Sequence, residues 1–186
     1  MRMLVLAVLA ATAIIARPSL AAPDNALIDY DGFARNVSEV RGLRESRRVS
    51  EADFIRMAGE PGTVVLDARS ERLFRLRHVK GAVNLSFPEF TGEALARVIA
   101  ARSTRVLIYC NNNFTGAPAS MPTKAVSSAL NLSTFVSLHA YGYHNVYELG
   151  PAVDVRASKL VFEGEEIGSR PIAAEAAAGT TTLSGT

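Results

Sequence analysis

The sequence predicts an α/β domain with a mostly parallel β-sheet. Residues 63–66 and 105–109 are short, continuous apolar runs rich in β-branched residues, and they fit strands that are buried on both faces. Segments with helical spacing of apolar residues alternate with these runs, which is typical of β-α-β units and of a parallel sheet. The chain has 186 residues, of which 48% are hydrophobic and 20% charged, so it can bury a single core.

In the first half of the chain, the predicted elements are two helices followed by two strands. Apolar residues in 26–47 recur at helical spacing and predict a helix that lies across the domain. Residues 50–53, Ser-Glu-Ala-Asp, form a capping box that begins a second helix, and Glu60-Pro61-Gly62 ends it. Strands are expected at 63–66 and at 82–85.

In the second half, a helix is expected over 92–101, where apolar residues gather on one side. The clearest strand of the chain follows at 105–109. Pro122 suits a first helical turn and predicts a long, mainly helical stretch from there to about residue 140. Residues 145–149 form the last predicted strand. The expected organisation is an N-terminal helical extension over 22–47 and one domain over 48–165.

The N-terminus predicts export. Arg2 precedes an almost wholly apolar run over 3–15, and small residues follow near Ala21, so residues 1–21 have the features of a cleaved signal peptide. An uncleaved N-terminal membrane anchor is the alternative. Export would place the protein in the periplasm or outside the cell, with no stable membrane insertion after cleavage.

The mature chain is predicted to carry no formal net charge. Removal of residues 1–21 takes away Arg2 and Arg17 and leaves equal numbers of basic and acidic residues. A neutral protein is a poor candidate for nucleic-acid binding, which requires neutralisation of phosphates. At the other end, residues 166–186 are predicted to be a disordered tail, because 173–186 consist mostly of Ala, Gly, Thr and Ser.

Cys110 is the only cysteine, which excludes an intramolecular disulfide and a multi-cysteine zinc site. It follows the strand at 105–109 and precedes a polar loop, and sites in open α/β sheets form beyond the carboxyl ends of strands. The thiolate is the reactive form of cysteine, so Cys110 is the candidate nucleophile. The alternative is an inert buried residue, which is the commoner role of a single cysteine.

Four segments, taken in order, resemble rhodanese-like domains. Residues 66–69, Leu-Asp-Ala-Arg, and 78–85, His-Val-Lys-Gly-Ala-Val-Asn-Leu, are similar to the Asp-x-Arg and Gly-His-Ile-Pro-Gly-Ala signatures of that family. Residues 106–110 resemble the strand that leads into the family's active-site cysteine, and 141–149 resemble its closing element. The match covers 48–150. It implies a three-layer α/β domain whose central, mostly parallel sheet has about five strands.

The resemblance also implies sulfurtransferase chemistry and a set of site residues. Cys110 would take a sulfane sulfur from a small sulfur-containing anion such as thiosulfate, become a persulfide and pass the sulfur to a thiol or other thiophilic acceptor. No cofactor is implied, and the three histidines lack the spacing of metal ligands. Asp67 and Arg69 are expected to have supporting roles, with Arg69 paired to an acidic neighbour, and His78 is expected to form supporting hydrogen bonds. The implied substrate-binding loop consists of Asn111, Asn112, Asn113, Phe114, Thr115 and Gly116.

The charge of the loop leaves the function open between an enzyme and a binding module. Residues 111–123 contain no Arg or Lys, although loops of the family often carry an Arg. A non-catalytic rhodanese-like binding module in the cell envelope is therefore the alternative, with the protein partner left open. The absence of a Cys-x5-Arg loop argues against phosphatase and arsenate-reductase chemistry.

Two further groups of polar residues each have two interpretations. The three asparagines of 111–113 could cradle a persulfide or a thiosulfonate, or they could only tolerate a tight turn. Arg72, Arg75 and Arg77 could steer an anionic donor toward the site, or they could form a solvated face.

Overall fold

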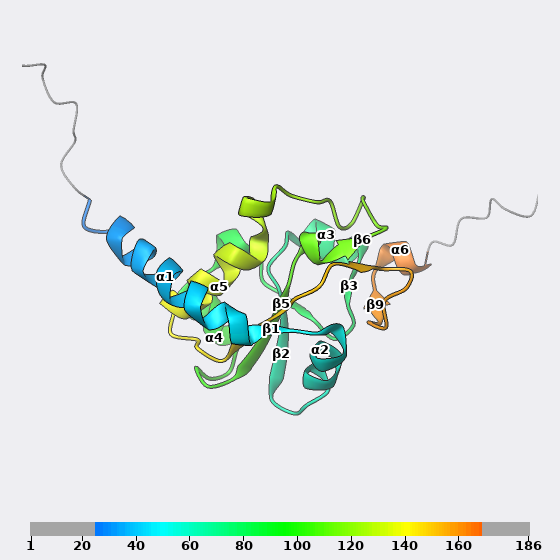
Figure 1. Cartoon of the computed structure of the whole chain (residues 1–186), viewed down its shortest axis with the longest axis horizontal. Helices are drawn as coiled ribbons and strands as arrows, with labels where there is room; N and C mark the ends of the chain where they lie inside the picture. The colour runs from blue at the N-terminus through cyan, green and yellow to red at the C-terminus, as the bar shows by residue number, and fades with distance from the viewer. Residues whose placement is uncertain (1–24, 169–186) are drawn as a thin grey trace, which may run out of the picture.

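The computed structural model describes residues 25–168, so the predicted signal peptide and the part of the predicted tail from 169 onward lie outside the described residues. Its centre is a five-stranded sheet in the order β1-β7-β5-β2-β4 (Figure 1). Every neighbouring pair of strands in this sheet is parallel, which confirms the predicted α/β class. The strands are β1 (Arg48–Val49), β2 (Thr63–Asp67), β4 (Val83–Asn84), β5 (Arg105–Tyr109) and β7 (Val146–Leu149).

Helices cover both faces of the sheet and complete the three layers (Figure 1). One face is covered by α1 (Tyr30–Arg47), α4 (Gly92–Val98) and α5 (Leu130–Ala140). The other face is covered by α2 (Glu51–Ala58), whose Phe54 and Met57 are buried. The helix α2 begins as predicted, because the Ser50 hydroxyl accepts a hydrogen bond from the Asp53 N–H at 3.1 Å.

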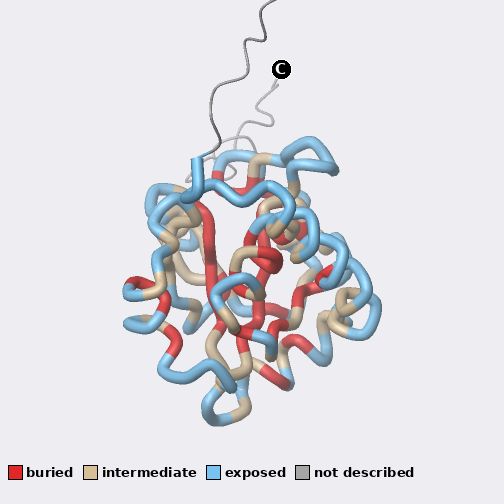
Figure 2. Tube along the Cα trace, turned by 90° about the vertical axis from the view of Figure 1, so that its left-hand side faces the viewer, coloured by how far each residue is buried: buried red, intermediate tan, exposed pale blue. Residues whose placement is uncertain are grey.

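The central strand β5 contributes to the core on both sides. Val106 and Ile108 belong to the cluster under α1, α4 and α5, whereas Leu107 and Tyr109 belong to the cluster under α2. All four side chains are buried, as a strand in the middle of a parallel sheet requires. Figure 2 shows buried segments of the chain inside a shell of exposed ones. Cys110 comes directly after this strand, so the buried centre of the sheet positions it.

The predicted helix that starts at Pro122 is wrong in its first half. The chain from 116 to 125 has no helix, a single 3-10 turn spans Val126–Ser128, and α5 begins only at Leu130. The Asn112 side chain accepts from the Lys124 N–H at 3.0 Å and donates to the Lys124 carbonyl at 2.8 Å. Lys124 therefore has both backbone groups bonded to a side chain, which competes with helix formation. The helix α4 is likewise shorter than predicted, because it ends at Val98.

The chain after β7 returns to the domain through two small sheets. In one, β3 (His78–Val79) pairs antiparallel with β9 (Phe162–Glu163), and in the other, β6 (Phe114–Thr115) pairs parallel with β8 (Val153–Asp154). These short strands carry too little hydrophobic pattern to be predicted.

The predicted start of the tail at residue 166 is too early. Residues 166–168 belong to α6 (Glu165–Gly168), and Glu166 accepts a hydrogen bond from the Ser120 hydroxyl at 2.6 Å. Glu166 also forms an ion pair with Arg77 at 3.2 Å, and α6 packs against α3 (Glu71–Leu76). Within 25–168, no helix has both the length and the apolar character needed to cross a membrane.

Candidate active site

Cys110 lines a cavity of about 360 Å³ at the carboxyl end of the sheet. The cysteine itself is buried, with an exposed fraction of 2%. The cavity lies between the loop after β5, the end of β7, the C-terminal end of α1 and the start of α5. Its lining includes Arg44, Arg48, Asn112, Asn113, Asn131, Glu148 and Gly150. This position beyond the strand ends is the one that the sequence predicted.

Asn113 holds the cysteine loop in place. Its side-chain oxygen accepts from the Cys110 N–H at 2.9 Å and from the Asn131 amide at 3.1 Å. Its side-chain nitrogen donates to the carbonyl of Leu149 at 2.7 Å. Asn112 is occupied by Lys124, as described above. Both side chains therefore hold the loop by hydrogen bonds, and both residues also line the cavity.

Asn111 differs from the two asparagines that follow it. It is completely buried, and neither polar atom of its side chain has a hydrogen-bond partner. It lines a second cavity, of about 270 Å³, together with Arg69, Ser70, Ser86 and Lys124. Asn111 does not line the cavity that holds Cys110.

The last three residues of the predicted loop do not line the Cys110 cavity either. Phe114 belongs to the core, where its ring contacts the ring of Phe162 edge-on at 5.3 Å. Thr115 is exposed and pairs with Asp154 in the small sheet. Gly116 has a φ of +82°, a conformation that favours glycine, so its role is in the turn.

Two arginines from outside the loop supply positive charge to the Cys110 cavity. Arg44 comes from the last turn of α1, and Arg48 from β1. Neither arginine was predicted as a site residue from the sequence, because both are far along the chain from the loop that follows Cys110. The helical extension before the domain therefore contributes part of the wall of the candidate site.

Glu148 faces the same cavity from β7. Its carboxyl is buried, and the Arg44 guanidinium donates to Oε1 through Nη2 at 2.5 Å and Nε at 2.9 Å. Burial raises the pKa of Glu148, and the positive charges of Arg44 and Arg48 oppose that rise. Glu148 was not predicted as a site residue either. A signal was available, since Val146 and Glu148 point to the same face of a buried strand and a glutamate there requires a partner.

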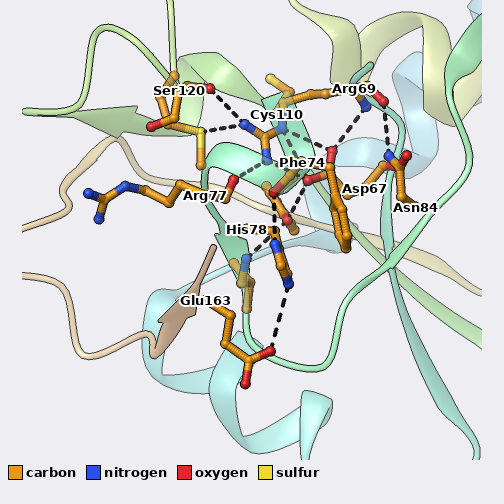
Figure 3. A network of polar contacts seen from close by, with 12 residues as sticks. Asp67, Arg69, Phe74, Arg77, His78, Asn84, Cys110, Ser120 and Glu163 are labelled. Atoms are coloured by element: carbon orange, nitrogen blue, oxygen red, sulfur yellow. Dashed lines mark hydrogen bonds and ion pairs between the residues drawn. The ribbon is translucent and has the colours of Figure 1, made fainter. Parts of the chain in front are cut away.

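Asp67 and Arg69 form a separate, buried ion pair (Figure 3). Asp67 is in register with Tyr109, whose side chain belongs to the cluster under α2, so this pair lies on the opposite face of the sheet from Glu148. Arg69 Nη2 lies 2.5 Å from Asp67 Oδ2 and also donates to the carbonyl of Arg77 at 2.7 Å, while Nη1 donates to the carbonyl of Ser120 at 2.9 Å. Tyr109 donates to Asp67 at 2.6 Å, and burial together with that carboxylate raises the pKa of Tyr109 well above its ordinary value. The expected pairing of Arg69 with an acidic neighbour is present.

His78 and the basic residues near it contact the C-terminal segment rather than Cys110. His78 Nδ1 lies 2.8 Å from the Phe74 carbonyl, and its ring stacks on the Phe74 ring with centroids 3.8 Å apart (Figure 3). Lys80 lies 3.7 Å from Glu163, and Arg77 pairs with Glu166. Acidic residues of β9 and α6 thus pair with Lys80 and Arg77, and these pairs argue against the interpretation that Arg77 steers an anion toward Cys110. Among residues 25–168, no three His, Cys, Asp or Glu side chains gather as a metal site.

The parallel sheet and the single cysteine directly after its central strand place the protein among the α/β domains that carry a site at the carboxyl ends of their strands. The model of the rhodanese-like domain family matches residues 50–150. The chain belongs to this family, as the sequence motifs indicated. A comparison with curated protein sequences gave no match.

Solved structures of low sequence identity are similar to this chain. The solution structure of the rhodanese-like domain from the Anabaena sp. Alr3790 protein is 19% identical and covers 75% of this chain and 96% of its own, with a TM-score of 0.46. The solution structure of protein hp1203 from Helicobacter pylori is 18% identical and covers 68% of this chain and 97% of its own, with a TM-score of 0.43. A structure of a rhodanese with anions from E. coli is 20% identical and covers 55% of this chain and 99% of its own, with a TM-score of 0.37.

Proposed function

We propose that the protein is a sulfurtransferase that carries sulfane sulfur on Cys110 as a persulfide. The observation that carries this proposal is the cavity next to Cys110, which has room for a small donor and includes Arg44 and Arg48 in its lining. Membership of the rhodanese-like family supports the same chemistry. The substrates would be a small sulfur-containing anion or persulfide as donor and a thiol as acceptor.

The reaction follows from the reactive thiolate. The Cys110 thiolate attacks the outer sulfur of the donor, the donor's S–S bond breaks, and the leaving group departs with the bonding electron pair. With thiosulfate, the leaving group is sulfite. An acceptor then attacks the terminal sulfur of the persulfide and restores the Cys110 thiolate. The hydrogen bonds of Asn113 fix the backbone of Cys110 while the sulfur of its side chain reacts.

The alternative proposal is a binding module that does not transfer sulfur. One observation favours it: the side chains of Asn112 and Asn113 are occupied by bonds within the protein, and the loop offers no positive charge of its own. In that case, the cavity would hold a small anion or a partner without chemistry at Cys110.

Mass spectrometry of the intact protein separates the two proposals. After incubation with thiosulfate or with glutathione persulfide, the enzyme should gain the mass of one sulfur atom at Cys110. Cys110→Ser, which is nearly isosteric, should fold normally and gain nothing. Folded wild-type protein that takes up no sulfur from either donor would favour the binding module.

We also propose that the protein is exported to the periplasm or secreted, on the basis of the sequence features of residues 1–21. N-terminal sequencing of the protein from the cell envelope should begin near Ala22. Recovery of the full-length chain in the cytoplasm would contradict export.

A further inference from the structure

Glu148 and Cys110 lie on the same face of the sheet. In the parallel register of β5 and β7, Glu148 is opposite Ile108, and Cys110 follows two residues after Ile108 in an extended conformation. Side chains two residues apart in an extended chain point to the same side. Both residues line the same cavity, so a molecule bound in this cavity next to Cys110 is also next to Glu148.

The Glu148 carboxyl has hydrogen-bonding capacity that the protein does not use. Its Oε1 is bonded to Arg44, but its buried Oε2 has no partner. The neighbouring amide of Asn131 interacts with this carboxyl, and the Asn131 side-chain oxygen is also buried without a partner. A buried acceptor without a partner is unfavourable, and a proton on Oε2 would turn that atom into a hydrogen-bond donor.

The surroundings of Glu148 suit a group that gains and loses a proton. The charged and titratable groups that line the cavity with it are Arg44 from α1, Arg48 from β1 and Cys110 after β5, and α5 contributes the neutral amide of Asn131. Burial favours the protonated form, whereas Arg44, the charge of Arg48 and the Asn131 amide stabilise the ionised form. Since these influences oppose one another, neither the protonated nor the ionised form of Glu148 is stabilised by all of its surroundings. A general acid–base residue must be able to adopt both forms.

We propose that Glu148 is the acid–base residue of the Cys110 cavity and that it serves sulfur donors and acceptors that are thiols. This inference rests on the proposed sulfurtransferase function. In the loading step, the Cys110 thiolate attacks the outer sulfur of a persulfide R–S–SH, which gives Cys110–S–SH and R–S⁻. The protonated Glu148 carboxyl then gives its proton to R–S⁻ and becomes a carboxylate.

In the unloading step, the Glu148 carboxylate takes the proton of an acceptor thiol R′–SH. The resulting R′–S⁻ attacks the outer sulfur of Cys110–S–SH, which gives R′–S–SH and the Cys110 thiolate, and Glu148 is protonated again. Over the cycle, one sulfur atom moves from R–S–SH to R′–SH, and no external oxidant, reductant or proton is consumed. Thiosulfate loads the Cys110 thiolate to give the ionised persulfide Cys110–S–S⁻ and sulfite, and sulfite unloads Cys110–S–S⁻ to give thiosulfate and the thiolate. No proton moves in either step, so neither needs Glu148.

The test compares two acceptors on the same sulfur-loaded protein at pH 8. Unloading to 2-mercaptoethanol requires removal of a thiol proton, whereas unloading to sulfite does not. Glu148→Gln keeps the size of the side chain and an oxygen for Arg44. It should slow unloading to 2-mercaptoethanol about 100-fold, the lower end of general acid–base contributions, and should not slow unloading to sulfite. The same substitution at the exposed residue Glu93, Glu93→Gln, is the matched control and should change neither rate.

A pH profile gives a second, independent readout. The wild-type rate with 2-mercaptoethanol should have an acid limb that is missing in Glu148→Gln, and Arg44→Met should move that limb to higher pH, because it removes the charge that stabilises the carboxylate. Equal slowing with both acceptors, or an unchanged acid limb in Glu148→Gln, would overturn the role of Glu148 and leave sulfur transfer standing. Wild-type protein that cannot be loaded by either thiosulfate or glutathione persulfide would remove the proposed function and this inference with it.

Discussion

Two arginine–carboxylate pairs lie at the carboxyl end of the sheet, one on each face, and they differ in how completely they are bonded. In the Asp67–Arg69 pair, both side chains are fully buried, and every polar atom has a partner in the protein. In the Arg44–Glu148 pair, Arg44 is partly exposed, and one oxygen of Glu148 has no partner. The first pair can only support the fold, whereas the second retains capacity for a ligand or a proton.

The largest expected effect comes from breaking the saturated pair. Arg69→Met leaves the Asp67 carboxylate buried without its partner, which should lower the free energy of unfolding by about 3–5 kcal/mol. Urea unfolding followed by circular dichroism measures this loss. The matched control is Arg97→Met in the exposed Arg97–Glu93 pair, where the change should stay below about 1 kcal/mol. Similar losses in the two variants would contradict the distinction between buried and exposed pairs.

The sequence predicted the strand and the cysteine at the centre of the site better than the charged residues that line the cavity. The strand at 105–109 and the position of Cys110 follow from local patterns, because hydrophobic runs act over a few residues, whereas the pairing of Arg69 was implied by the resemblance of Asp67-Ala68-Arg69 to a family signature. Arg44 and Glu148 are 104 residues apart, and only the order of the strands brings them together. The strand β1, which carries Arg48, has two residues and no recognisable pattern.

The predicted substrate loop was too long for the same reason. A continuous stretch from Asn111 to Gly116 looks like one functional unit, but Phe114 enters the core and Gly116 enters a turn. Pro122 misled the helix prediction because its fixed φ suits a first helical turn and an irregular loop equally well. The bonds between Asn112 and Lys124 decide between these two conformations, and they join residues twelve positions apart.

An intermediate effect is expected at Gly116, which tests whether the end of the loop belongs to the site or to the fold. A Cβ atom there would lie 2.6 Å from Asp154 Oδ1, and the backbone φ of +82° disfavours alanine. Gly116→Ala should therefore lower the free energy of unfolding by more than about 1 kcal/mol. The variant should still take up one sulfur atom per chain, measured by intact mass. Gly92→Ala, at a helical position with open space around the new Cβ, is the control and should not be destabilised.

The smallest effect is a difference in the pH dependence of stability, which sharpens the contrast between Glu148 and an ordinary bonded carboxylate. The folded state raises the pKa of Glu148, so it binds the Glu148 proton more tightly than the unfolded chain does. Ionisation of Glu148 therefore costs stability as the pH rises above 4.5, the ordinary glutamate pKa. Glu51 has the opposite shift: a hydrogen bond from Ser158 lowers its pKa, so its carboxylate adds stability above 4.5 that is lost as the pH falls.

Substitution of each of these two glutamates by glutamine should consequently change the dependence of stability on pH in opposite directions. Relative to the wild type, Glu148→Gln should gain stability as the pH rises from 4 to 8, while Glu51→Gln should lose stability over the same interval. Urea midpoints measured at several pH values, with the slope of each transition checked for constancy, give both differences. A Glu148→Gln curve that runs parallel to the wild type would mean that the fold holds this carboxyl no differently from the unfolded chain. The contrast with the saturated Asp67–Arg69 pair would then no longer single out Glu148 as the group that exchanges a proton.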